Sequence, residues 1–218
     1  MNRYSPTVTL ALMLVSSSLP ATASAAAPHP AYPVRPVRMI VPYPAGGSGD
    51  VIARLLAQRL TATLGQTIIV DNRPGASGLV GTELASKAAP DGYTLLLTTG
   101  NNAINVTLHP KLPYDLVRDF EPVALLAPEI PTIAESGVPG YASGQWYGLL
   151  VPAGTPQEII TWLHRETATL LRSANVKERL AAEGLEVVAS SPEEFAALIK
   201  TDIAKWTKLV KTIDLPLL

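Results

Sequence analysis

The sequence predicts an α/β fold in which helices cover a parallel β-sheet. Three short apolar segments, Val37 to Val41, Thr67 to Val70 and Tyr93 to Thr99, have the length and composition of buried strands. Helical patterns of apolar residues separate the first strand from the second and the second from the third. Strands that alternate with helices at this spacing form parallel sheets connected by crossover helices.

The first predicted helix follows a glycine-rich turn, Tyr43 to Asp50, with the sequence YPAGGSGD. Gly65 ends this helix, and the apolar residues on its buried face are Val51, Ile52, Leu55, Leu56 and Leu60. The loop Asn72 to Gly78 follows the second strand and leads into a helix of small residues that ends near Ala89. A Pro-Asp-Gly turn then precedes the third strand.

The C-terminal third of the chain also alternates between strands and helices. Gln145 to Pro152 and Leu185 to Ser190 are predicted strands. Thr155 to Glu158 and Ser191 to Glu194 each have the pattern of a capping box with proline at the first helical position. We expect the first box to open a helix that ends near Arg172, and the second to open a long amphipathic helix.

The middle of the chain, Gly100 to Gly144, lacks this alternation. Proline interrupts it repeatedly, and one strand is predicted at Val123 to Leu126. The organised sequence therefore lies at the two ends of the chain.

The first 25 residues have the pattern of a secretory signal peptide. Arg3 is their only charged side chain, Val8 to Val15 is a short apolar run, and Ala23-Ser24-Ala25 is a small-residue cleavage pattern. We therefore expect cleavage after Ala25, a Pro-rich flexible lead-in at residues 26–36 and a periplasmic location. The chain has no cysteine, which excludes disulfides and lipid attachment through an N-terminal cysteine.

The composition excludes several classes of function. The formal net charge of the 218-residue chain is −1, and a near-neutral chain lacks the clustered basic surface of a nucleic-acid-binding protein. No later segment reaches the roughly 20 apolar residues that are needed to span a membrane. The three histidines have no metal-ligand spacing, so neither a metal nor another cofactor is expected. The spacing of the carboxylates identifies no catalytic pair.

The glycine-rich turn fails the tests for two nucleotide-binding motifs. A P-loop requires a lysine at the start of the helix, and none follows here. A dinucleotide fingerprint requires a third glycine where Ile52 stands.

The glycine-rich turn matches a nucleophile elbow except that Asp50 replaces the last glycine. A secreted α/β hydrolase using Ser48, with His109 or His164 as base, is therefore the alternative to a binding function.

A strand that leads through such a turn into a helix can also bind an anion through backbone amides. Asp50 would then be the N-cap, and the amides of Gly46, Gly47 and Ser48 would remain free for a carboxylate or a phosphate. A tight connection without any ligand is the structural alternative.

Two further pairs of residues are open to both structural and functional interpretations. Asn101 and Asn102 directly follow the third strand, either as turn residues or as hydrogen-bond donors to a ligand. Trp146 and Tyr147 begin an apolar strand, where they belong to the core or to the wall of a cleft.

Long stretches of the chain resemble one protein family. They include YPVRPVRMIVPYPAGGSGDVIARLLAQRL, VDNRPGASGLVGTELASKAAPDGYTLLLTTGNNAIN and LPYDLVRDFEPVALLA in the first part of the chain. Two later segments complete the match, PTIAESGVPGYASGQWYGLLVPAGTP and VKERLAAEGLEVVASSPEEFAALIKTDIAKWTKLVK. Together with the signal peptide, these segments, which extend from Tyr32 to Lys211, resemble the Bug family, the extracytoplasmic solute receptors of tripartite tricarboxylate transporters.

The resemblance implies a receptor and not an enzyme. In this family two α/β lobes of the type II periplasmic binding protein fold close on a small organic acid, often a di- or tricarboxylate. The receptor then passes the ligand to its membrane partners, one small and one large subunit. The ligand loop of the first lobe corresponds to Tyr43–Asp50, and the adjoining walls to Gly75–Gly78 and Thr99–Asn102. The implied ligand-binding residues are Tyr43, Ala45, Gly46, Gly47, Ser48, Asp50, Ser77, Gly78, Thr99, Gly100 and Asn101.

The chain departs from the family in its length. Members commonly have about 300 residues, enough for two lobes, whereas EPVALLA is followed here at once by PEIPTIAESG. About 100 residues, most of the second lobe, have no counterpart at this junction near Ala127 to Glu129. We expect residues 37–126 and 145–218 to form a largely complete first lobe, and residues 127–144 to form a short remnant connection. Ligand binding is then reduced or absent, and a truncated product without function is a further alternative.

Overall fold

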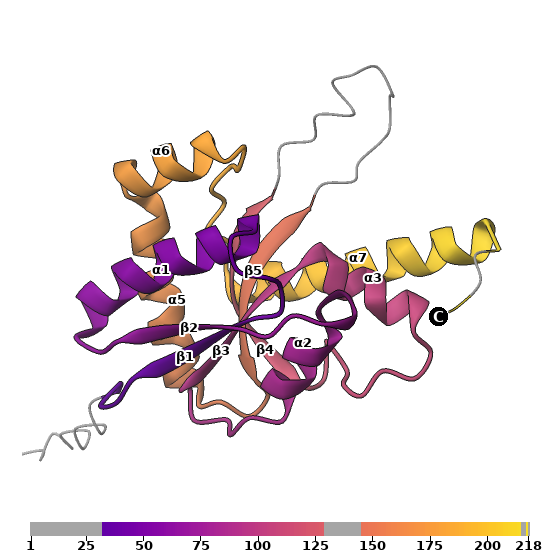
Figure 1. The fold of residues 1–218 in the computed structure, drawn as a ribbon, viewed down its shortest axis with the longest axis horizontal. Helices are drawn as coiled ribbons and strands as arrows, with labels where there is room; N and C mark the ends of the chain where they lie inside the picture. The colour runs from indigo at the N-terminus through magenta and orange to yellow at the C-terminus, as the bar shows by residue number, and fades with distance from the viewer. Residues whose placement is uncertain (1–31, 129–144, 215–216, 218) are drawn as a thin grey trace, which may run out of the picture. The chain divides into compact units, whose positions relative to one another are not determined.

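The computed structural model describes residues 32–128, 145–214 and 217 (Figure 1). The expected signal peptide, most of the expected lead-in and most of the expected remnant connection lie outside these residues. Within them, five strands form one mixed sheet in the order β2-β1-β3-β5-β4. Helices pack on both faces of this sheet (Figure 1).

The first half of the fold is a parallel β-α-β-α-β arrangement, as the sequence predicts. Its strands are β1 (Val37–Val41), β2 (Ile68–Asn72) and β3 (Thr94–Thr99), and β1 pairs in parallel with both of the others. Helix α1 (Ser48–Leu64) and helix α2 (Leu79–Ser86) are the crossover connections, and a short 3-10 helix η1 (Ala76–Gly78) precedes α2. Gly65 ends α1 in the left-handed conformation that favours glycine, with φ of 65°.

The second half adds two antiparallel strands. They are β4 (Phe120–Pro128) and β5 (Trp146–Pro152), which pair with each other, and β5 also pairs with β3. The helices are α3 (Gly100–Leu108), α5 (Gln157–Arg172), α6 (Ala174–Ala182) and α7 (Pro192–Thr212). The chain on both sides of residues 129–144 therefore contributes to a single sheet.

The core consists of two apolar layers, one on each face of the sheet. One layer packs β1, β3, β4 and β5 against α1, α5 and α6, and the other packs the same sheet against α2, α3 and α7. Gly148 of β5 is required by this packing, because a Cβ atom there would lie 2.0 Å from Cζ of Phe195 on α7. Burial of such apolar side chains is the main stabilising term for a chain without disulfides.

The two capping boxes that the sequence predicts have different outcomes. The box at Ser191 is confirmed, since its hydroxyl accepts the N–H of Glu194 and the Glu194 carboxylate accepts the N–H of Ser191. The prediction of a capping box at Thr155 is wrong. The Thr155 hydroxyl donates instead to the carbonyl of Pro152 at 2.7 Å, and Pro156 occupies the N-cap position without a side-chain cap. The turn after β5 thus competes successfully for the hydroxyl.

Three further differences concern secondary structure. Leu185 to Ser190 is not a strand: apart from a single bridge residue at Leu185 it has no regular secondary structure, and it lies beside β4 with hydrogen bonds from the N–H of Glu186 to the carbonyl of Pro128 and from the N–H of Val188 to the carbonyl of Leu126. Helix α3 lies where the sequence pattern shows only proline-punctuated segments, and α6 was not predicted at all. No helix in the described part of the chain has the length and apolar character needed to cross a membrane.

Candidate ligand-binding site

The candidate site lies where three loops follow the carboxyl ends of β1, β2 and β3. These loops are Tyr43–Ser48, Gly75–Gly78 and the β3–α3 junction at Thr99–Asn101. The carboxyl ends of neighbouring parallel strands lie at the same edge of the sheet, where open α/β sheets bind their ligands. All the ligand-binding residues that the family resemblance implies lie on these loops or in the first turn of α1.

Asp50 is not the N-cap of α1, contrary to the sequence-based expectation. The N-cap is Gly47, and Asp50 is the third residue of the helix, only 3% exposed. Its carboxylate accepts the N–H of Gly46 at 2.9 Å, Nε of Arg54 at 2.9 Å and Nδ2 of Asn72 at 3.0 Å. The amide of Gly46 is therefore already used and is not free for a ligand.

The ionised form of Asp50 is stabilised by these contacts. Burial acts to raise the pKa of its carboxyl group, but the hydrogen bonds from Arg54, Gly46 and Asn72 outweigh burial and lower the pKa below its ordinary value. Asp50 therefore ties the glycine-rich loop to α1 and to the end of β2 as a carboxylate, and the charge of Arg54 is balanced within the protein.

The amides of Ser48, Gly49 and Asp50 lack an acceptor among the described residues. They form the first turn of a helix of 17 residues, where the unpaired N–H groups and the helix dipole both favour an anion. Ser48 is an exposed residue at this end of the helix, whereas Gly49 and Asp50 are buried. The geometry suits a carboxylate bound by neutral donors.

Ser48 is held by a tyrosine and not by a histidine. Its Oγ lies 2.6 Å from the hydroxyl of Tyr147, a buried residue of β5. Nδ1 of His164 is engaged with the carbonyl of Val123 at 3.0 Å. In the described part of the chain neither His109 nor His164 is hydrogen-bonded to Ser48, so the hydrolase alternative is not supported.

The loop between β2 and α2 has positive φ angles, which residues other than glycine rarely adopt. Ala76, Ser77 and Gly78 have φ values of 44°, 54° and 94°. The carbonyl of Ser77 accepts Nδ2 of Asn105 at 2.9 Å, and the carbonyl of Gly78 accepts the hydroxyl of Thr82 at 2.8 Å. These contacts from α2 and α3 hold the exposed Ser77 in its left-handed conformation.

The β3–α3 junction is mostly buried. Thr99 caps α3 through a capping box with Asn102, and its hydroxyl also lies 2.6 Å from the hydroxyl of Tyr43. Thr99 and Gly100 are buried, whereas Asn101 is exposed. At this junction Asn101 therefore remains the side chain that is accessible to a ligand.

The implied site residues fall into two groups by exposure. The exposed ones are Ala45, Gly46, Gly47, Ser48, Ser77 and Asn101. Tyr43 is half-buried, and the buried ones are Asp50, Gly78, Thr99 and Gly100. The buried residues position the loops, and the exposed residues are available to a ligand.

Sequence reasoning missed several residues that hold these loops. Asn72, Thr82 and Asn105 were not singled out, and Asn102 was considered as a turn residue or ligand donor. The spacing Thr99-x-x-Asn102 resembles a capping box and was the available signal. Asn72 and Asn105 reach the loops from other elements, and neither has a local motif.

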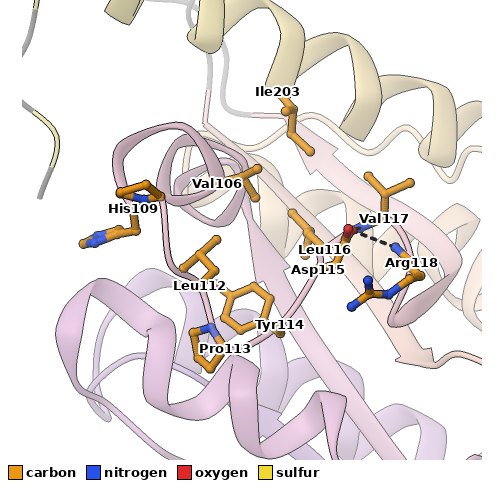
Figure 2. Close-up of a pocket in the computed structure, with 11 residues that line it drawn as sticks. Val106, His109, Leu112, Pro113, Tyr114, Asp115, Leu116, Val117, Arg118 and Ile203 are labelled. Carbon is orange, nitrogen blue, oxygen red and sulfur yellow. Dashed lines mark hydrogen bonds between the residues drawn. The ribbon is translucent and has the colours of Figure 1, made fainter.

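A cavity of about 550 Å³ lies elsewhere, between the end of α3, the loop at residues 109–118 and Ile203 of α7 (Figure 2). None of the implied site residues lines it. The carboxylate of Asp115 in its wall accepts the backbone N–H groups of Val117 and Arg118, both at 2.9 Å. The carboxylate of Asp115 is thus already used within the loop at residues 109–118. The cavity is separate from the candidate site at the edge of the sheet.

Comparison with known proteins identifies the family. The family model TctC, described as tripartite tricarboxylate transporter family receptor, matches residues 52–127 and 124–215. The chain belongs to this family. The members are periplasmic solute-binding receptors and not enzymes. Among the described residues, no three histidine, cysteine, aspartate or glutamate side chains gather as a metal-ligand group.

Individual TctC-family proteins are similar over most of this chain. BugT of Bordetella pertussis is 27% identical over 314 residues, which cover 92% of this chain and 96% of BugT. The periplasmic binding protein BugD has a TM-score of 0.79 at 22% identity, covering 86% of this chain and 100% of BugD. MatC from Rhodopseudomonas palustris with bound malate has a TM-score of 0.76 at 24% identity, covering 82% and 100%.

The chain is short for a TctC-family receptor. The alignment with BugT extends over 314 positions, whereas the chain has 218 residues. The difference between these numbers means that at least 96 positions have no residue of this chain opposite them. The two segments that match the family model meet at residues 124–127.

Proposed function

We propose that the chain binds a small organic acid, such as a di- or tricarboxylate, as the receptor of a tripartite tricarboxylate transporter. The observation that carries this proposal is the group of unpaired amides of Ser48, Gly49 and Asp50, at the edge where the three loops meet. Structural relatives solved with malate and with adipate support a dicarboxylate. We propose that the exposed residues identified above contact the ligand together with the backbone amides of the buried Gly49 and Asp50, and that Gly78, Thr99 and Gly100 hold the loops.

We further propose that most of the second lobe is absent, at the junction near Ala127 to Glu129. The difference in length from BugT and the meeting point of the two family matches support this position. A single lobe leaves much of the ligand in water, whereas small-molecule sites usually bury most of the ligand surface. We therefore expect weak binding.

The expected affinity follows from the donors present. Three hydrogen bonds from neutral groups contribute about 1 kcal/mol each, and the helix dipole adds about 1 kcal/mol. These contributions sum to about 4 kcal/mol, so a Kd of about 1 mM is the tightest value expected, because association also costs translational and rotational freedom. No further charge is available from Arg54, because Asp50 is paired with it.

The proposal can be tested by NMR titration of residues 26–218 with malate, adipate and citrate. We expect saturable shifts at the Ser48 and Gly49 amides with a Kd of about 1 mM or weaker, and none with the corresponding diamide of malate. Absence of shifts with all three acids would contradict carboxylate binding and favour a truncated product without function. Sub-micromolar binding by the monomer would contradict the loss of a second lobe.

Two variants at one position isolate the contribution of a single amide. Ser48 is the first residue of α1, where proline is favoured, and the preceding Gly47 has the extended conformation that proline requires. Ser48→Pro removes the N–H and the hydroxyl, whereas Ser48→Ala removes the hydroxyl alone. We expect Ser48→Pro to raise the Kd about fivefold relative to Ser48→Ala. Equal Kd values would exclude this amide from the site.

The location and the partners are also proposals. The N-terminal signal pattern supports export and cleavage after Ala25. Intact mass measurement of the protein from a periplasmic fraction would test the cleavage position. Crosslinking in cells that also produce the small and large membrane subunits would test the partnership. Retention of residues 1–25 in the cytoplasmic fraction would contradict both.

A further inference from the structure

We propose that Asn102 is a positioning residue whose buried side-chain amide joins the three loops of the site into one unit. This inference rests on the proposed function, because the loops serve as ligand walls only if the chain binds at this edge. Asn102 is fully buried as the third residue of α3. It acts through other residues and does not touch the ligand.

The oxygen of the Asn102 side chain connects two of the loops. Oδ1 accepts the backbone N–H of Thr99 at 3.2 Å, at the start of α3. It also accepts the hydroxyl of Tyr43 at 3.2 Å, from the loop after β1. A direct contact of 2.6 Å between the Tyr43 and Thr99 hydroxyls closes a triangle around Oδ1.

The nitrogen of the same side chain reaches the third loop. Nδ2 donates to Oγ1 of Thr82 at 2.7 Å, and Thr82 in turn donates to the carbonyl of Gly78 at 2.8 Å. The close approach of Tyr43 to this loop depends on Gly78, whose missing Cβ would lie 3.3 Å from the Tyr43 hydroxyl. The Asn102 amide thus accepts hydrogen bonds from the loop after β1 and from the β3–α3 junction. It is connected to the loop after β2 through its hydrogen bond to Thr82.

The chemistry of the amide explains why a carboxamide stands at this position. It provides an acceptor and a donor on one planar group, and both are used here. An apolar side chain of similar size would leave the buried N–H of Thr99 and the hydroxyls of Tyr43 and Thr82 with fewer partners. Buried polar networks in which all groups are satisfied rigidify the elements that they connect.

The deciding measurement is the NMR order parameter of the loop glycine amides, which reports mobility independently of any ligand. In the unchanged chain we expect values of about 0.85 at Gly46, Gly47 and Gly78. Asn102→Leu should lower the values in both loops to below about 0.6. Thr82→Val, which cuts only the second branch, should lower the value at Gly78 and leave Gly46 and Gly47 rigid.

Thr167→Val is the matched control. Thr167 is fully buried on α5, and its hydroxyl has no hydrogen-bond partner among the described residues, so this substitution should change no loop order parameter. A lower melting temperature in Asn102→Leu with increased mobility confined to α3 would overturn the proposal and leave Asn102 as a helix cap only. If Asn102→Leu does not fold, unchanged mobility at Gly78 in Thr82→Val overturns it.

The malate titration separates this inference from the proposed function. We expect Asn102→Leu and Thr82→Val to raise the Kd about fivefold, and Thr167→Val to leave it unchanged. An unchanged Kd in both loop variants would overturn the positioning role. If the unchanged chain binds no carboxylate, the proposed function fails, while the order parameters still decide whether Asn102 joins the loops.

Discussion

The carboxylate of Asp50 accepts the backbone N–H of Gly46, four residues earlier in the chain, at 2.9 Å. This hydrogen bond folds the glycine-rich loop back onto the first turn of α1. The same carboxylate binds Asn72 at the end of β2, so a single side chain links the loop to two neighbouring elements.

Asp50→Ala should destabilise the fold by about 1–3 kcal/mol, because it removes three hydrogen bonds to a buried carboxylate. Arg54→Gln is the control, since it weakens the partly exposed ion pair with Asp50 and the hydrogen bond from Arg54 to Asn72, but leaves the Gly46 and Asn72 contacts of the Asp50 carboxylate in place. Urea denaturation of both variants measures the difference. Equal free energies of unfolding would show that the Gly46 and Asn72 contacts contribute nothing.

Stability should decline in acid because several carboxyl groups, Asp50 and Asp71 among them, titrate at a lower pH in the folded state. Burial acts to raise the pKa values of Asp50 and Asp71, but their hydrogen bonds and arginine partners lower both below the ordinary value of 3.8. The stabilisation is complete above about pH 5 and is lost as the pH falls through the lowered values. Urea midpoints between pH 3 and pH 7 should show this fall, with a smaller slope for Asp50→Asn. An identical slope in that variant would exclude Asp50 as a source.

Gly148→Ala should destabilise the fold by about 1–3 kcal/mol or more, because the new methyl group overlaps the ring of Phe195. Phe195→Leu creates space at the same point and costs stability by itself. The double variant should therefore be more stable than the sum of the two single effects predicts. Thermal unfolding of the three variants measures this coupling, and strict additivity would contradict the proposed overlap.

Removal of a tyrosine hydroxyl should change the stability of the fold differently at two sites. The buried hydroxyl of Tyr114 has no hydrogen-bond partner in the described part of the chain, although Asn102 and Thr82 lie near it, and burial raises the pKa of this hydroxyl to about 12. Tyr114→Phe should therefore be neutral or stabilising. The hydroxyl of Tyr32 donates to the carbonyl of Gly92 at 2.6 Å, so Tyr32→Phe should cost about 1 kcal/mol. Equal losses in thermal unfolding would show that Tyr114 has a partner.

The parts of the fold that the sequence predicts correctly depend on local patterns. The parallel strands β1 to β3 and the helix α1 follow from apolar periodicity and from Gly65. The capping box at Ser191 could be predicted from the sequence because both of its hydrogen bonds join residues that are only three positions apart. Helix α3 was missed because Gly100, Asn101 and Asn102 are typical turn residues, and its cap at Thr99 also depends on Tyr43.

Local pattern determined the strands, most of the helices and the position of the glycine-rich loop, since hydrophobic periodicity and capping act over a few residues. Tertiary structure alone decided that β5 runs antiparallel to β3 and that Tyr147 meets Ser48, 99 positions away in the chain. Tertiary structure also decided that the Asp50 side chain links the glycine-rich loop to β2 and does not cap α1, because Asn72 on β2 donates to the same carboxylate. Contacts between distant segments depend on how whole elements pack, and no short pattern encodes that packing.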